Sequence, residues 1–176
     1  MPRHPASQER LYSEIAAEYD GALERLARAY ERDADRRRDL LQEIHVALWR
    51  SLARFDGRCS TRTWVYRVAH NVATSRVIRV KRCTPTFVAS VDLESIPDHR
   101  DNGDYLDRRR TLDRVYQLIE QLRPIDRQVM LLYLEDIDAA SIAEITGLSA
   151  GNVATRVHRL KQTLARRFHA RDADHD

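Results

Sequence analysis

The stretch that decides the fold is residues 138–168, DAASIAEITGLSAGNVATRVHRLKQTLARRF. Its apolar spacing predicts a short helix over residues 139–146 and a second helix over residues 150–168, capped by Ser149. Gly147 falls just past the first helix, where the chain needs a left-handed conformation that glycine adopts without steric cost. The segment therefore predicts a helix-turn-helix, in which two helices pack closely at a steep angle.

The predicted second helix has two contrasting faces. Its apolar face consists of Val153, Val157, Leu160 and Leu164. Its opposite face is polar, contains no acid, and consists of Asn152, Thr155, Arg156, His158, Arg159 and Lys161. Such side chains hydrogen-bond to base edges and phosphates, so the motif predicts DNA binding without naming a class of protein. The alternative is a helical hairpin whose polar face is only solvated.

Basic residues are gathered in two blocks, although the formal net charge of the chain is only +3. Residues 61–82 carry six Arg or Lys and no acid, and residues 151–171 carry six more, again without an acid. Between these blocks, residues 91–107 carry six acids and one arginine. This distribution is typical of two modules that contact a polyanion and are joined by a different kind of segment.

The first half of the chain also predicts helices, because apolar residues recur there every three or four positions. These helices run over about residues 11–30, 39–53 and 61–82. Asp39 is the expected N-cap of the second helix, and residues 31–38 are expected to form a charged turn before it. Glycine and proline are scarce, with five of each, as expected for a largely helical chain.

Residues 84–107 contain prolines and a glycine, lack a lasting apolar period, and predict a linker. Helices resume near Arg110 and at Pro124, since proline suits the first turn of a helix. We expect an all-α fold of two small helical domains joined by a flexible linker, with the helix-turn-helix in the C-terminal domain. The expected bounds are residues 1–83 for the N-terminal domain, 84–109 for the linker, 110–170 for the C-terminal domain and 171–176 for a tail.

Several classes of protein fit the sequence poorly. No apolar run is long enough to insert into a membrane, and the N-terminus lacks the apolar core of a signal peptide. The two cysteines, Cys59 and Cys83, have no partner at metal-binding spacing, so we expect no metal, no cofactor and a cytoplasmic location. No nucleophile and base, paired carboxylates or metal ligands converge, so the chain is not expected to be an enzyme.

Two halves of the sequence together resemble one family. Residues 39–43 (DLLQE), 48–50 (LWR), 55–56 (FD) and 63–71 (TWVYRVAHN) resemble region 2 of the extracytoplasmic-function sigma factors of RNA polymerase. Residues 122–164 are similar to region 4 of the same family. The order and spacing of the two regions and the linker between them also agree. A helix-turn-helix is widespread, whereas this pairing is specific.

The resemblance implies a division of labour between the halves. The N-terminal half would bind the coiled coil of the polymerase beta-prime subunit and recognise the −10 promoter element. The C-terminal half would read the −35 element and contact the beta flap, and an anti-sigma protein would hold the free factor. The implied polymerase contacts are Asp39, Gln42, Glu43 and Trp49. The implied −10 contacts are Arg58, Ser60, Arg62, Trp64, Arg67, His70 and Asn71. The implied −35 contacts are Ser149, Asn152, Ala154, Thr155, Arg156, His158, Arg159 and Lys161.

Some of these residues have a second interpretation. Trp64 could equally be a core aromatic, and Trp49 either a core or an interface residue. Glutamine and glutamate at positions 42 and 43 could be solvated helix positions. The sequence also departs from the family at residues 36–38, where three arginines stand in place of acids, and at Asn152 and Ala154, where threonine and a basic residue are common.

Three functions can be weighed on these observations. A sigma factor would direct core polymerase to promoters without catalysis of its own. A stand-alone helix-turn-helix regulator is the alternative, but it leaves residues 39–43 and 63–71 unexplained. An enzyme acting on nucleic acid is the weakest, because no catalytic set converges. The sequence therefore predicts a sigma factor that assists promoter opening.

Overall fold

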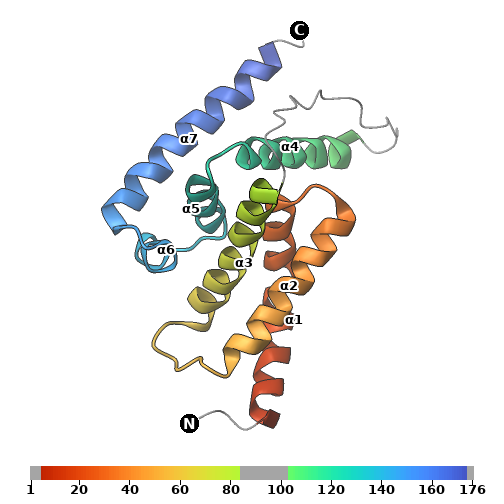
Figure 1. Ribbon diagram of the computed structural model, residues 1–176. Coiled ribbons are helices and arrows are strands. Elements are labelled where there is room, and N and C mark those ends of the chain that lie inside the picture. The colour runs from red at the N-terminus through yellow and green to blue at the C-terminus, as the bar shows by residue number, and fades with distance from the viewer. Residues whose placement is uncertain (1–4, 84–102, 174–176) are drawn as a thin grey trace.

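The computed structural model of the chain describes residues 5–83 and 103–173, and these residues form seven helices (Figure 1). The helices are α1 (Pro5–Tyr30), α2 (Ala34–Leu52), α3 (Thr61–Cys83), α4 (Gly103–Glu120), α5 (Pro124–Leu134), α6 (Ala139–Thr146) and α7 (Ala150–Ala173). The described ranges contain no strand, and the all-α prediction is confirmed. Most of the predicted linker, residues 84–102, lies outside the described residues.

Helices α1, α2 and α3 pack into one bundle because each carries a continuous apolar stripe. The stripe of α2 repeats every four residues and is fully buried; it consists of Leu40, Ile44, Leu48 and Leu52. It meets Leu23 and Leu26 of α1 and Val65 and Ala69 of α3 in the same core. Burying one such aliphatic side chain stabilises the fold by about 1.5–3 kcal/mol.

The second group of helices is held together by local signals in the sequence. Pro124 begins α5, as predicted. Helix α6 ends at Gly147, which has a φ of 76° and donates its backbone N–H to the carbonyl of Ala143. Helix α7 then begins, and Val153 and Leu160 on its apolar face are buried. The predicted helix-turn-helix is therefore confirmed in its turn and in the start of both helices, whereas its second helix runs beyond residue 168.

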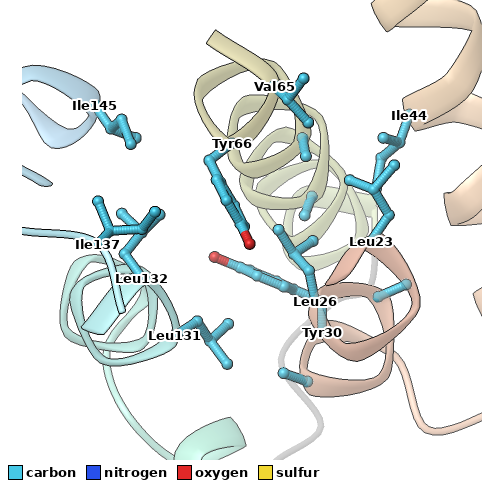
Figure 2. Close-up of a cluster of buried hydrophobic side chains, with 14 of the residues drawn as sticks. Leu23, Leu26, Tyr30, Ile44, Val65, Tyr66, Leu131, Leu132, Ile137 and Ile145 are labelled. Atoms are coloured by element: carbon cyan, nitrogen blue, oxygen red, sulfur yellow. The ribbon is translucent and has the colours of Figure 1, made fainter. Parts of the chain in front are cut away.

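The two groups of helices pack against each other. Helix α3 lies against α5 and α6, and α1 lies against α4 (Figure 1). Leu131, Leu132, Ile137 and Ile145 of the C-terminal half face the N-terminal bundle, as Figure 2 shows. The hydroxyl groups of Tyr30 and Tyr66 point into the space between the halves (Figure 2). One continuous apolar core therefore spans both expected domains.

Four predicted helix boundaries were wrong. The helix α2 begins at Ala34 rather than Asp39, because the carboxylate of Asp33 accepts the free backbone N–H groups of residues 35 and 36. The charged turn is thus the exposed first turn of α2. Helix α1 begins earlier, at Pro5, and α7 runs further, to Ala173. Helix α4 begins at Gly103, inside the predicted linker, since no proline interrupts the run that follows.

Candidate nucleic-acid and polymerase interface

The start of α7 is built to project side chains into solvent. Ser149 caps the helix, with its hydroxyl oxygen accepting the backbone N–H of Asn152 at 3.3 Å and its carbonyl accepting that of Val153 at 3.0 Å. Most of the predicted −35 residues are exposed, in the first turns and on the outer face of α7. These exposed residues are Ser149, Asn152, Ala154, Thr155, His158, Arg159 and Lys161.

Arg156 differs from the other predicted −35 residues because it is turned toward the protein. Its side chain is only 22% exposed, and its Nη1 donates to Oδ1 of Asp126 in α5 at 2.5 Å. Its Nε donates to Oδ1 of Asn152 at 2.9 Å. Asp126 is 6% exposed at its side chain and also accepts Nε of Arg123 at 3.1 Å. Arg156 therefore cross-links α5 and α7 and lies only at the edge of the exposed face.

A groove of about 980 Å³ runs between α2 and α3. It brings together three of the four predicted polymerase-contact residues. Those residues are Asp39, Gln42 and Glu43. Glu43 accepts hydrogen bonds from Arg76 at 2.8 Å and from Arg79 at 3.3 Å, so its negative charge is partly neutralised by α3. The groove therefore has a mixed-charge wall and an apolar floor that includes Val46.

Trp49, the fourth predicted polymerase residue, lies outside the residues that line this groove. The residue is 39% exposed, and its ring meets the ring of Tyr12 in α1 edge-on, with centroids 5.3 Å apart. Its backbone carbonyl accepts the amide of Gln8 at 2.9 Å. Trp49 is thus a half-exposed aromatic between α1 and α2, which leaves one face available to a partner.

The predicted −10 residues on α3 are divided by the structure. Trp64 is 9% exposed and packs against Phe55, so its interpretation as a core aromatic is confirmed. Asn71 is exposed and lines the groove between α2 and α3. Arg62 and Arg67 are instead engaged by the C-terminal half of the chain. Arg62 donates to the backbone carbonyl of Glu135, and Arg67 forms an ion pair of 2.5 Å with Glu144 of α6.

His70 does not lie on an exposed polar face, as the sequence had suggested, but in the core. It is 1% exposed, and its Nδ1 is 3.1 Å from the hydroxyl of Tyr30. Burial lowers the pKa of His70 to about 3, so the ring is neutral near pH 7. Its Nε2 has no hydrogen-bond partner among the described atoms. A neutral, enclosed imidazole supports the packing of α1 on α3 and offers nothing to DNA in this arrangement.

The loop between α2 and α3 carries the remaining −10 residues. Arg58 is strongly exposed and pairs with Asp56 at 2.7 Å. Ser60 caps α3, since its hydroxyl oxygen accepts the backbone N–H of Thr63 at 3.0 Å. Gly57 adopts a φ of 77°, which turns the loop sharply. The loop therefore exposes Arg58, in an ion pair with Asp56, and uses Ser60 as the cap of α3.

Two sequence profiles of one protein family match the regions that carry these surfaces. Residues 15–83 match the sequence profile of Sigma-70 region 2, and residues 112–164 match that of Sigma-70, region 4. The groove and α3 fall in the first match, and the helix-turn-helix falls in the second. The chain belongs to the sigma-70 family of RNA polymerase sigma factors. The resemblance seen in the sequence is therefore confirmed.

Individual relatives of the sigma factor point to its extracytoplasmic-function group. It is 25% identical to the RNA polymerase sigma-H factor of Pseudomonas aeruginosa over 172 residues, covering 93% of this chain and 89% of that protein. It is 29% identical to the ECF RNA polymerase sigma factor SigC of Mycobacterium tuberculosis over 138 residues, covering 77% and 72%. The fold agrees with a sigma factor RpoE solved with the anti-sigma factor NepR from Bartonella quintana. That match has a TM-score of 0.68, 20% identity, and coverage of 87% and 93%.

Three residues that hold predicted site residues or join the two halves of the sigma factor were not predicted from the sequence. Asp126 fixes Arg156, Glu144 pairs with Arg67, and Glu135 contacts Arg25 and Tyr66 of the N-terminal half. Asp126 had a weak signal, because an acid in the first turn of a helix is usually a dipole partner rather than a ligand for the next helix. The two glutamates had none, since their partners lie 69 or more residues away in sequence.

The described residues contain neither a membrane-spanning helix nor a cluster of metal ligands. None of the seven helices is long and apolar enough to cross a membrane over those residues. Within the same ranges, no group of three or more His, Cys, Asp or Glu side chains gathers as metal ligands. Cys59 is a free, half-buried thiol.

Proposed function

We propose that this sigma factor directs core RNA polymerase to promoters by reading the −35 element with α7 and the −10 element with α3 and the preceding loop. The observation that carries the proposal is the exposed, acid-free outer face of α7 in a capped helix-turn-helix. Recognition helices of this motif enter the major groove with their N-terminal residues at the base edges. Sigma factors generally act without catalysis, and we extend this to the present chain.

The groove between α2 and α3 is the proposed binding site for the beta-prime coiled coil of polymerase. It offers carboxylates, an amide and an apolar floor to a helical partner. Exposed Val46 and half-exposed Trp49 extend the apolar surface along α2. Near the start of α2, Arg36 and Arg38 are exposed and Arg37 is half-buried, so this end of the surface carries basic residues that are unusual for the family. The C-terminal half is proposed to contact the beta flap.

The −10 role requires the two halves to separate. Arg62 and Arg67 are occupied by the backbone and a carboxylate of the C-terminal half, where they would otherwise meet phosphates. Glu135 and Glu144 thus stand in the positions that a nucleic-acid backbone would take. We therefore assign promoter opening to a rearranged form of the protein in which α5 and α6 have moved away from α3.

An anti-sigma protein is the proposed regulator, and the cytoplasm the proposed location. Solved proteins of the same fold support this partner, since CnrH was solved with the cytosolic domain of CnrY and RpoE with the anti-sigma factor NepR. The closed arrangement of the two halves is compatible with a factor that an anti-sigma protein holds inactive and then releases.

Run-off transcription from a library of templates tests the function. Specific transcripts are expected only when core polymerase and this protein are both present. Specific binding to promoter DNA by the isolated protein, with no gain in transcription on adding polymerase, would favour the stand-alone regulator. Binding to DNA should also weaken with salt by about 0.9 log units per log unit for each phosphate contacted.

A further inference from the structure

Asp126 lies at the centre of a chain of contacts that reaches the exposed start of α7. It accepts Arg156 at 2.5 Å, it is approached by Arg159 at 3.9 Å, and it is itself almost fully buried. A buried carboxylate keeps its charge only when cations hold it, so the Arg156 guanidinium is fixed rather than free. The other edge of that guanidinium group then faces Asn152.

The orientation of the Asn152 amide follows from the chemistry of Arg156. An arginine side chain has only hydrogen-bond donors, so the atom of Asn152 that meets Nε must be the oxygen Oδ1. The amide nitrogen Nδ2 is thereby turned away from Arg156. Asn152 is exposed in the first turn of α7, and no partner for Nδ2 occurs among the described residues. The protein therefore presents a donor at this position.

Resting on the proposed −35 reading by α7, we infer that Asp126 and Arg156 are positioning residues that make Asn152 a hydrogen-bond donor that selects against cytosine. In the major groove, guanine O6 and N7, thymine O4 and adenine N7 accept hydrogen bonds, whereas cytosine offers only its N4 donor. A free asparagine reads adenine with both amide atoms. Asn152 has its oxygen engaged, so it donates from Nδ2 to guanine, thymine or adenine N7 and disfavours cytosine, which offers no acceptor, at one promoter position.

The test is transcription by core polymerase from a library randomised through the −35 element, with the base frequencies counted at each position. The wild-type protein should disfavour cytosine at one position by about five- to tenfold. Asn152→Asp keeps the contact to Arg156 but replaces the outward donor by an acceptor. It should invert the preference at that position toward cytosine, whose N4 donates.

Arg156→Lys separates positioning from stability. A lysine keeps the positive charge beside Asp126 but has no Nε donor for Asn152, so the amide can rotate and the preference should relax. Gln162→Glu is the matched control for charge, because this exposed residue lies further along α7, beside His158. It should weaken binding without changing the base preference.

The outcomes distinguish this inference from the proposed function. If the wild-type protein supports no transcription from any template, the proposed function fails. If it does, but Asn152→Asp leaves the base preference unchanged and lowers transcription uniformly, Asn152 contacts phosphate and the inference is overturned. An Arg156→Lys variant that keeps the full wild-type preference would also overturn it.

Discussion

Arg25 of α1 and Glu135, the residue that follows α5, form a bidentate ion pair between positions 110 residues apart in the sequence. Arg25 Nε and Nη2 donate to the two carboxylate oxygens at 2.6 and 2.7 Å, and the Tyr66 hydroxyl donates to the second oxygen at 2.9 Å. Burial alone would raise the pKa of Glu135, but the bonds from Arg25 and Tyr66 outweigh it and lower that pKa. This one carboxylate therefore joins α1 and α3 of the N-terminal bundle to the C-terminal half.

Glu135→Gln should open the protein, because the amide keeps the shape but loses the charge that Arg25 and Tyr66 recognise. Since Arg25 is 54% exposed at its side chain, the pair contributes only about 1 kcal/mol to closure. That loss raises the population of the open form about fivefold. The measurement is the radius of gyration by small-angle scattering, together with binding of single-stranded −10 DNA, and both should increase.

Glu14→Gln is the control for this variant. Glu14 pairs with Arg10 within α1, at 3.1 Å, and makes no contact between the halves. Its substitution should change neither the size of the protein nor DNA binding. If Glu135→Gln matches the control in both measurements, the carboxylate does not hold the closed arrangement.

The buried His70 predicts a specific dependence of stability on pH. Its pKa is about 3 in the folded protein and near 6.5 when exposed, so the unfolded chain gains a proton that the folded chain does not. Stability is therefore fully present above pH 6.5 and decreases as the pH falls from 6.5 toward 3, by at most about 1.4 kcal/mol per pH unit. Glu135, whose pKa is lowered from 4.5, adds to this loss only below about pH 4.5, in the lower part of the range.

Chemical denaturation between pH 5 and 7 isolates the histidine contribution. The slope should be flatter in His70→Asn, where the amide can still meet the Tyr30 hydroxyl. Nuclear magnetic resonance titration of the wild-type ring checks the same point without a substitution. A His70 ring that titrates near pH 6.5 in the folded protein would show that it is accessible to solvent and would contradict its burial.

The sequence predicted the helix-turn-helix closely because its signals are local. Gly147 and Ser149 fix a turn and a cap within three residues, so neither needs knowledge of the rest of the fold. The cap of α2 was misplaced for the opposite reason. Asp33 and Asp39 are both plausible caps, and the first turn of α2 has no buried apolar residue to reveal that the helix has already begun.

Which polar residues of α3 are buried, paired or exposed could not be predicted from local signals. A helix face with Arg67, His70 and Asn71 looks uniformly polar in sequence, yet the structure buries His70, pairs Arg67 and exposes only Asn71. His70 packs against Tyr30 of α1, and Arg67 meets Glu144 of α6, which is 77 residues away in the sequence. Contacts of this kind depend on tertiary structure and leave no period in the sequence.

Arg156 and Arg159, three residues apart on α7, should respond differently to alanine. Arg156→Ala leaves the buried Asp126 carboxylate with Arg123 as its only close partner, and we expect a loss of about 2 kcal/mol in unfolding free energy. Arg159 is 59% exposed and lies 3.9 Å from the same carboxylate, so its replacement should change stability by about 0.5 kcal/mol or less.

Binding assays complete this comparison. Arg159→Ala should weaken recognition of the −35 element by about tenfold and leave affinity for core polymerase nearly unchanged. An equal loss in both assays would refute a role for Arg159 in DNA binding. A loss of stability in Arg159→Ala as large as that in Arg156→Ala would show that both arginines are structural.

The groove between α2 and α3 allows a test of whether Glu43 serves polymerase or only the fold. Glu43 is 40% exposed at its side chain, whereas its partner Arg76 is 15% exposed, so the carboxylate remains accessible while the guanidinium group is enclosed. Glu43→Gln should weaken binding to core polymerase about tenfold, measured by fluorescence anisotropy, and lower the free energy of unfolding by about 1 kcal/mol or less.

The control is Glu24→Gln on the exposed side of α1, which should change neither the affinity for polymerase nor the free energy of unfolding. A different result would contradict this role. If Glu43→Gln and Arg76→Met both lower the free energy of unfolding and neither changes the affinity for polymerase, Glu43 only holds α2 to α3. A charge at the polymerase interface would change that affinity.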